Sequence, residues 1–219
     1  KIISGETKMC FAVTEPDTGL DTTRLKAKAV KKNNHYIING RKIWTSTAQI
    51  TNKIMIIART SERNDKHPTQ GLSLFYTDFN RDYIEARVIH KMGRAAVDSN
   101  ELFIDNLKVP NDDLVGEEGK GFSYLIQSLN PERILVAAEA YGIAKNALDR
   151  AVKYAKERIV FERTIGKNQS IQHPLADGWA KLESVKLLIL KAANLYDNKE
   201  PCGTEANAAK YLAAEFGIE

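Results

Sequence analysis

The chain has 219 residues, 43% of them hydrophobic, which is enough for one or two domains with a buried core. Its 32 basic and 28 acidic residues give a formal net charge of +4, too mild and too evenly mixed to indicate a nucleic-acid-binding protein. Cys10 and Cys202 lie far apart in the sequence and fit a reducing compartment, and no spacing of His and Cys predicts a metal site.

No apolar run is long enough to span a bilayer, since the densest, Leu187 to Leu190, is far too short. No signal peptide is visible. The chain starts at Lys1 without a methionine and ends inside an expected helix. We therefore expect it to be part of a longer protein.

The first half of the chain predicts short strands without intervening helices. Apolar or alternating runs mark the strands, and polar segments with Gly, Pro or Asn separate them. Asn39-Gly40 lies between two of them and predicts a hairpin, because a type I′ turn needs positive φ at both positions. Such a succession predicts an antiparallel β-barrel or sandwich. The expected strands are residues 9–14, 25–30, 35–38, 41–45, 53–59, 71–77, 83–88 and 100–104.

The pattern changes to helix after Val109-Pro110-Asn111-Asp112-Asp113. We take this segment as the boundary between a β-barrel domain at residues 1–112 and a helical domain at residues 113–219. The expected fold class is therefore α+β.

The helical domain is expected to contain three long helices. The first starts at Gly121, and at Asn130-Pro131 it either kinks or restarts with Asn130 as the N-cap. The second covers about 169–196, and Thr204 caps the third. Long helices with short connections predict a bundle, here lacking its last member.

The first strand ends abruptly. Met9 to Thr14 is apolar, but Pro16 lacks the N–H that a strand ladder needs and Gly19 permits positive φ. The backbone N–H groups near Val13 and Thr14, with the Thr14 hydroxyl, are therefore free to face a flat, acceptor-rich ring. The alternative interpretation of this segment is an ordinary strand followed by a turn. Trp44, at the end of a later strand, also has an alternative interpretation, as an aromatic residue packed in the core.

Two paired motifs favour the ligand interpretation. Thr14-Glu15-Pro16-x-x-Gly19-x-Asp21, followed by Asn39-Gly40-x-Lys42-x-Trp44-x-Ser46, resembles the middle domain of the acyl-CoA dehydrogenase family. Farther on, Glu132-Arg133, Phe161 and Gln169 are similar to that family's helical domain. The resemblance covers essentially the whole chain, and it implies that a further helical domain precedes Lys1 and another helix follows Glu219.

The resemblance implies non-covalently bound FAD as the cofactor. Trp44 is expected to lie against the flavin ring and Ser46 to contact it, with Phe11, Val13 and Thr14 completing this part of the site. Hydrogen-bond donors fixed there stabilise negative charge on reduced flavin.

Three further residues are expected to reach FAD bound by a neighbouring subunit: Arg158, Phe161 and Gln169. The planar guanidinium of Arg158 suits a diphosphate. From the residues alone, the same three are a helix end, a core aromatic and the start of the next helix.

The substrate-binding candidates are Gly19, Leu20, Asn130 and Arg133. Many relatives carry a serine at the position of Leu20, which contacts the coenzyme A portion, whereas Leu20 has no hydroxyl. The catalytic candidate is Glu132. Most of the family places its base in a later segment, but members resembling isovaleryl- and long-chain acyl-CoA dehydrogenases place it just before an arginine, as in Glu132-Arg133. The alternative is that Glu132 only complements a helix N-terminus.

The function implied by the resemblance is FAD-dependent oxidation of an acyl-CoA to the trans-2-enoyl-CoA, as in fatty acid β-oxidation, with electrons passed to an electron-transfer flavoprotein. A homodimer or homotetramer is expected, in the cytoplasm or, in a eukaryote, the mitochondrial matrix. A related flavin oxidase or monooxygenase and a noncatalytic CoA-binding scaffold are the alternatives.

Overall fold

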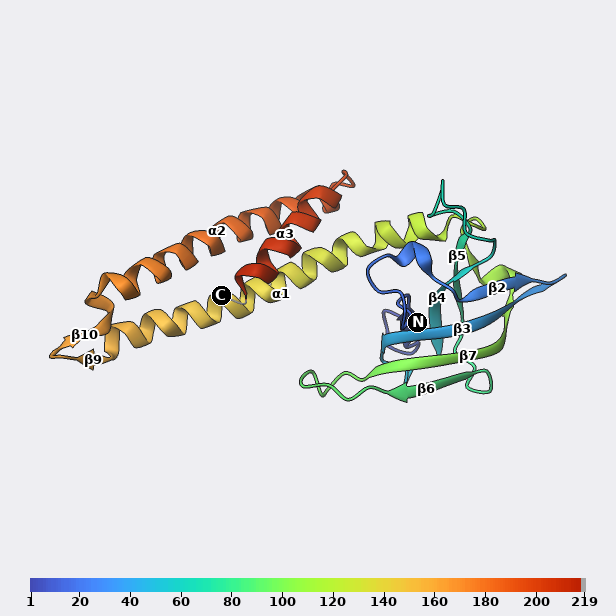
Figure 1. The fold of residues 1–219 in the computed structure, drawn as a ribbon, viewed down its shortest axis with the longest axis horizontal. Helices are drawn as coiled ribbons and strands as arrows, with labels where there is room; N and C mark the ends of the chain where they lie inside the picture. Colours follow the sequence, from blue (N-terminus) through green and yellow to red (C-terminus); the bar gives the residue numbers. More distant parts are fainter. Residues whose placement is uncertain (218–219) are drawn as a thin grey trace. The chain divides into compact units, whose positions relative to one another are not determined.

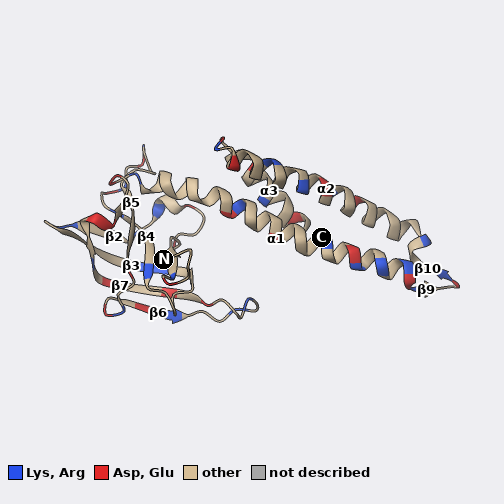
Figure 2. Cartoon of the chain, turned by 180° about the vertical axis from the view of Figure 1, so that it is seen from behind, with Lys and Arg blue, Asp and Glu red and all other residues tan. Residues whose placement is uncertain are grey.

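The computed structural model describes residues 1–217 as two compact units, one ending at Ile126 and the other starting at Gln127 (Figure 1). The first unit is built on a β-sheet and the second on helices, which confirms the α+β class. Basic and acidic residues are interspersed along both units rather than gathered by sign (Figure 2). The domain boundary after residue 112 stays a prediction.

One mixed sheet of eight strands organises the first unit, in the order β6-β7-β3-β2-β4-β5-β8, with β1 paired to β4. The β1–β4 and β2–β4 pairs are parallel and the others are antiparallel. The strands are β1 (Met9–Ala12), β2 (Lys28–Lys31), β3 (His35–Ser46), β4 (Lys53–Arg59), β5 (Leu72–Asp78), β6 (Ile84–Val88), β7 (Ser99–Pro110) and β8 (Leu114–Val115).

Of the antiparallel barrel and sandwich expected from the sequence, the barrel is wrong, because the described residues form no closed barrel. The sheet is open, because β6 and β8 stand at opposite ends of the strand order. It is also mixed, because β1 and β2 both run parallel to β4, β1 along its first half and β2 at its last residue, Arg59. A succession of short strands predicts a sheet but carries no information on closure.

The predicted hairpin at Asn39-Gly40 is also wrong, because β3 runs straight through it. Asn39 pairs with Lys28 of β2, and Gly40 pairs with Ile104 of β7. The Asn39 side chain accepts a hydrogen bond at 2.8 Å from the Asn106 backbone N–H, where β7 bulges. Gly40 is required by close approach, since a Cβ built there would lie 2.6 Å from the Cβ of Ala27.

The core of the first unit lies along the buried faces of these strands. Tyr36 and Phe75 meet edge to face, with ring centroids 4.9 Å apart. Around this aromatic pair lie mostly branched apolar side chains, the type that packs well on a pleated surface. The buried members include Ile38, Ile54, Ile56, Leu102, Ile104, Leu107 and Val109.

The helices are α1 (Gly121–Glu157), α2 (Gln169–Asp197) and α3 (Gly203–Phe216). Pro131 lies inside α1, so the helix does not restart there and Asn130 is not an N-cap. The N-cap of α3 is Cys202 rather than Thr204. None of the described helices is long and apolar enough to cross a membrane.

Small residues line the core of the helical unit. Its buried members are Ile134, Ala137, Val185, Ile189, Ala192, Ala206, Ala209 and Ala213. Alanines permit close helix approach. Between α1 and α2 the chain forms a small hairpin, β9 (Ile159–Val160) and β10 (Arg163–Thr164), which lies at the turn where α2 comes back alongside α1 (Figure 1).

Candidate functional site

The strand end after β1 is closed into a tight turn by Glu15. Its backbone N–H donates to the Thr18 carbonyl at 3.1 Å and its carbonyl accepts from the Thr18 N–H at 3.0 Å. The Glu15 side chain is only 5% exposed, and its carboxylate accepts from the backbone N–H groups of Lys26 at 2.6 Å and Ala27 at 2.9 Å. Glu15 is therefore the anchor that joins this turn to the chain leading into β2.

A buried lysine holds the same strand end against β3. Lys42 is 0% exposed, and its Nζ donates to the Val13 carbonyl at 2.9 Å and to Glu15 Oε1 at 3.0 Å. The next residue, Ile43, donates its N–H to the Thr14 carbonyl at 2.9 Å. Burial lowers the pKa of Lys42 to about 8, although the Glu15 carboxylate acts in the opposite direction. The backbone of residues 13–15 is thus fixed from one side.

The sequence analysis gave no role to the Glu15–Lys42 pair. A signal was present: the period of two in β3 places Lys42 on the same face as Tyr36 and Ile38, which are buried. A lysine on the buried face of a strand requires a partner.

Trp44 is displayed by a β-bulge. Between the pairs Lys42–Leu102 and Thr45–Asn100, β3 contains one residue more than β7. Trp44 has φ of +61°, which is rare for a bulky residue, and the residue is 57% exposed. The core interpretation of Trp44 is therefore wrong. Since Ile43 is bonded to Thr14, the bulge brings an exposed indole next to the fixed strand end.

The other candidates of this unit surround that point. Phe11 lies in β1, partly buried and paired with Met55, and Ser46 is exposed at the end of β3. A Cβ on Gly19 would lie 3.8 Å from Thr14 Cγ2, so Gly19 lies beside Thr14. Leu20 is fully exposed.

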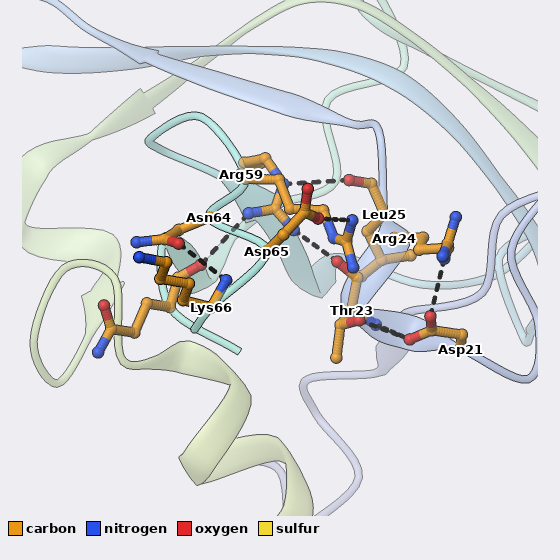
Figure 3. A network of polar contacts seen from close by, with 10 residues as sticks. Asp21, Thr23, Arg24, Leu25, Arg59, Asn64, Asp65 and Lys66 are labelled. Atoms are coloured by element: carbon orange, nitrogen blue, oxygen red, sulfur yellow. Dashed lines mark hydrogen bonds and ion pairs between the residues drawn. The ribbon is translucent and has the colours of Figure 1, made fainter. Parts of the chain in front are cut away.

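A polar network fixes the segment after Leu20 (Figure 3). The buried Arg59 guanidinium donates to the carbonyls of Thr23 at 2.7 Å, Leu25 at 3.3 Å and Gln70 at 3.2 Å. Burial lowers the pKa of Arg59. The Asp21 carboxylate accepts from the Thr23 N–H at 3.1 Å and from Arg24 Nε at 2.9 Å. Gly19 and Leu20 therefore lie between two fixed points, Thr18 and Asp21.

In the helical unit, Asn130, Glu132 and Arg133 lie on α1. Arg133 Nη1 donates to Asn130 Oδ1 at 3.0 Å, which orients both polar groups. Glu132 is exposed. The charge of the helix dipole acts on side chains in the first turn of a helix. Because α1 starts at Gly121, Glu132 lies beyond that turn. The interpretation of Glu132 as a complement to a helix N-terminus is therefore wrong.

Arg158, Phe161 and Gln169 lie at one end of the helical unit. Arg158 follows the last residue of α1, and its carbonyl accepts from the Ile165 N–H at 2.9 Å. Phe161 lies in the hairpin turn with φ of +49° and is 94% exposed, so it is not a core residue. Gln169 is the exposed first residue of α2. Among the residues described, no group of three or more metal-binding side chains occurs.

Two family models match the chain in succession. Acyl-CoA dehydrogenase, middle domain, matches residues 10–107, and acyl-CoA dehydrogenase, C-terminal domain, matches residues 119–219. The chain belongs to the acyl-CoA dehydrogenase family. The resemblance inferred from its motifs is thereby confirmed.

Curated members of this family are similar along the whole chain. The chain is 38% identical to a 3-(aryl)acrylate reductase from Clostridium sporogenes, over 100% of this chain and 57% of the relative. It is 37% identical to the caffeyl-CoA reductase-Etf complex subunit CarC from Acetobacterium woodii, over 98% of this chain and 56% of the relative.

The solved FAD complex of PigA is similar with a TM-score of 0.91 and 26% identity, over 99% of this chain and 56% of that chain. The chain thus spans about half the length of these relatives.

Proposed function

We propose that the protein containing this chain is an FAD-dependent acyl-CoA dehydrogenase, which interconverts an acyl-CoA thioester and its trans-2-enoyl-CoA. The observation that carries the proposal is the fixed backbone at Val13 and Thr14 beside the exposed indole of Trp44. Family membership and the FAD complex of a structural relative support the choice of cofactor.

The residues present fit a flavin. Within residues 1–217, no described group accepts a hydrogen bond from the Thr14 N–H or hydroxyl, so both are available to the ring's acceptor atoms. Trp44 offers a flat apolar face, and Ser46 adds a hydroxyl two residues on. When bound, FAD supplies the two-electron acceptor for the hydrogen that leaves the substrate β-carbon.

The chain's own residues supply the acid–base and binding functions. Glu132 takes the proton from the α-carbon, while Arg133 and Asn130, already bonded to each other, bind the substrate. Gly19 and Leu20 lie along the coenzyme A portion, where Leu20 contributes contact area but no hydroxyl. An electron-transfer flavoprotein is the proposed electron partner, as the name of the Acetobacterium relative supports.

Reduction of a 2-enoyl thioester is the second candidate for the physiological direction. Two of the most similar relatives carry reductase names, for a caffeyl-CoA and a 3-(aryl)acrylate. The same residues serve both directions, since Glu132 returns the proton that it would otherwise remove. Two experiments without oxygen compare the directions. The reduced protein is mixed with cinnamoyl-type thioesters and the oxidised protein with saturated ones, and the rates at which the flavin is oxidised or reduced are measured. Admitting oxygen then tests for an oxidase, and binding without any turnover would favour a scaffold.

We expect the full-length protein to bind one FAD per subunit and Trp44→Ala to weaken that binding about fivefold, from the loss of roughly 1 kcal/mol of ring contact. The measurement is FAD titration of apoprotein by flavin fluorescence. Trp179→Ala is the matched control, because Trp179 is similarly exposed but lies on α2. Refolded wild-type protein that shows no flavin absorbance after reconstitution would contradict the proposal.

We also expect a homo-oligomer in which Arg158, Phe161 and Gln169 reach the FAD of a neighbouring subunit. The helical unit supports this, because it exposes large apolar side chains such as Leu135, Ile143 and Leu187 at 60% or more. Arg158→Ala should weaken FAD binding about tenfold, since one charge-assisted hydrogen bond to a diphosphate is worth about 1.5 kcal/mol or more.

Analytical ultracentrifugation of the FAD-loaded full-length protein measures the oligomer, and Arg150→Ala on the exposed side of α1 is the control for a lost positive charge. A monomer that retains FAD would rule out the shared site, and wild-type affinity in Arg158→Ala would remove Arg158 from it.

A further inference from the structure

Lys42 has no part in the proposed chemistry, yet it is the most completely buried cation at the strand end. Its side chain is 0% exposed, and the carboxylate beside it, Glu15, is 5% exposed. Both groups have several hydrogen-bonding partners: Glu15 accepts from two backbone N–H groups and from Lys42 Nζ, and Lys42 Nζ donates to Glu15 Oε1 and to the Val13 carbonyl.

Stability is a weak explanation for such a pair. Removing two charges from water costs several kcal/mol, and apolar residues of similar volume are often as stable or more so. Burial outweighs the attraction of Glu15 at Lys42, whose pKa falls to about 8. The other partner of the ammonium group is the Val13 carbonyl, on which a buried positive charge has a direct electronic effect.

The Val13 carbonyl and the Thr14 N–H belong to the same peptide group. A cation that donates to the carbonyl oxygen draws electron density toward it and makes the N–H a stronger donor, as hydrogen bonds in a chain polarise one another. The effect is larger inside a protein, where the dielectric constant is low. The Thr14 N–H is a donor to which no described residue offers an acceptor.

We propose that Lys42 is a positioning residue that acts through the Val13 carbonyl to strengthen the Thr14 N–H toward bound flavin and so favours the reduced, more negatively charged ring. This inference rests on the proposed binding of FAD at the strand end. Lys42 does not touch the ring; it sets both the place of the Val13–Thr14 peptide and its polarity.

The experiment measures the affinity of the full-length protein for oxidised and for reduced FAD, and the midpoint potential by spectroelectrochemical titration without acyl-CoA. Lys42→Met removes the charge and the donor. Lys42→Gln removes the charge but keeps two N–H donors for Val13 and Glu15, so it is the variant less disturbing to the fold. We expect the preference for reduced FAD to fall about tenfold in Lys42→Met, which equals about 30 mV for a two-electron couple, and by a smaller factor in Lys42→Gln.

Arg59→Met is the matched control. Arg59 is also a buried cation that donates to backbone carbonyls, but those belong to Thr23, Leu25 and Gln70 rather than to Val13. It should lower the unfolding midpoint as a buried-charge variant does, and change the preference for reduced FAD by less than either Lys42 variant does.

Three outcomes would overturn the inference. A wild-type preference for reduced FAD in both Lys42 variants would leave Lys42 as a purely structural residue while the proposed function stands. An equal loss in Arg59→Met would assign the change to general destabilisation. Wild-type protein that binds no FAD would overturn the proposed function together with the inference.

Discussion

Glu132→Gln in the full-length protein is expected to keep FAD bound and to slow the bleaching of flavin by a saturated acyl-CoA by a factor of about 10²–10⁴, the usual contribution of a general base. Glutamine preserves the size of the side chain but cannot accept the α-proton. The measurement is rapid mixing of oxidised protein with acyl-CoA in the absence of oxygen, followed at the flavin absorbance.

The structure makes Glu132 a better candidate than the sequence did. Its position about three turns into α1 removes the stabilisation of a carboxylate by a helix N-terminus, which is confined to the first turn. Desolvation favours the protonated form of a carboxyl group, so an acyl chain that covers Glu132 and expels water makes it a stronger proton acceptor. Within residues 1–217, no ion pair with a described residue opposes that change.

The matched control is Glu139→Gln. Glu139 is exposed on the same helix, two turns farther on and so on nearly the same face. It should change the bleaching rate by less than about twofold, because its carboxylate lies two helical turns away from that of Glu132. A wild-type rate in Glu132→Gln would show that Glu132 is not the base. A loss in both variants would indicate damage to α1 rather than to proton transfer.

The elements that the sequence predicted well are those whose local signals and tertiary environment agree. β4 is a continuous apolar run and was predicted with the bounds that the structure has, Lys53–Arg59, and α2 was predicted to within a residue. The predicted hairpin at Asn39-Gly40 is wrong because the turn preference of these two residues is local. Strand β3 is paired along both edges, and this long-range pairing prevailed. The prediction of a barrel failed because closure of a sheet depends on which of its edge strands pair with each other.

The candidate site divides in the same way. The early end of the first strand was predictable because Pro16 acts locally, although β1 ends at Ala12 rather than at the expected Thr14 and Gly19 does not adopt positive φ. The positive φ of Trp44 accompanies the one extra residue that β3 has opposite β7 between the pairs Lys42–Leu102 and Thr45–Asn100, a bulge that no window of sequence displays. The roles of Arg158, Phe161 and Gln169 depend on a second subunit, so one chain can show only that the three lie exposed at the same end of the helical unit.

Gly40→Ala is expected to destabilise the full-length protein by about 2–5 kcal/mol, combining an overpacked core with a strained backbone. The new Cβ would lie 2.6 Å from the Cβ and 2.8 Å from the Cα of Ala27, so the backbone of one strand has to move. Gly40 also has φ of +156°, which residues with a side chain rarely adopt. Denaturant unfolding followed by circular dichroism measures the change.

The same substitution in a different setting is the control. Gly142 is an exposed residue of α1, and a Cβ added there would have no atom within 4 Å. Gly142→Ala should therefore stabilise the protein by up to about 1 kcal/mol through helix propensity. Ala27→Gly combined with Gly40→Ala removes the nearest of the clashing atoms and should recover part of the loss. Additive effects of these two substitutions would contradict the close approach.

The expected damage extends to the candidate site, because Ala27 is bonded to it. The Ala27 N–H donates to the Glu15 carboxylate at 2.9 Å, and the Ala27 carbonyl accepts from the Arg59 N–H at 2.7 Å. A shift of Ala27 away from Gly40 therefore disturbs the anchor that fixes Val13 and Thr14. We expect Gly40→Ala to weaken FAD binding as well as stability, whereas a destabilised variant with wild-type FAD affinity would show that the strand end is fixed independently of β2.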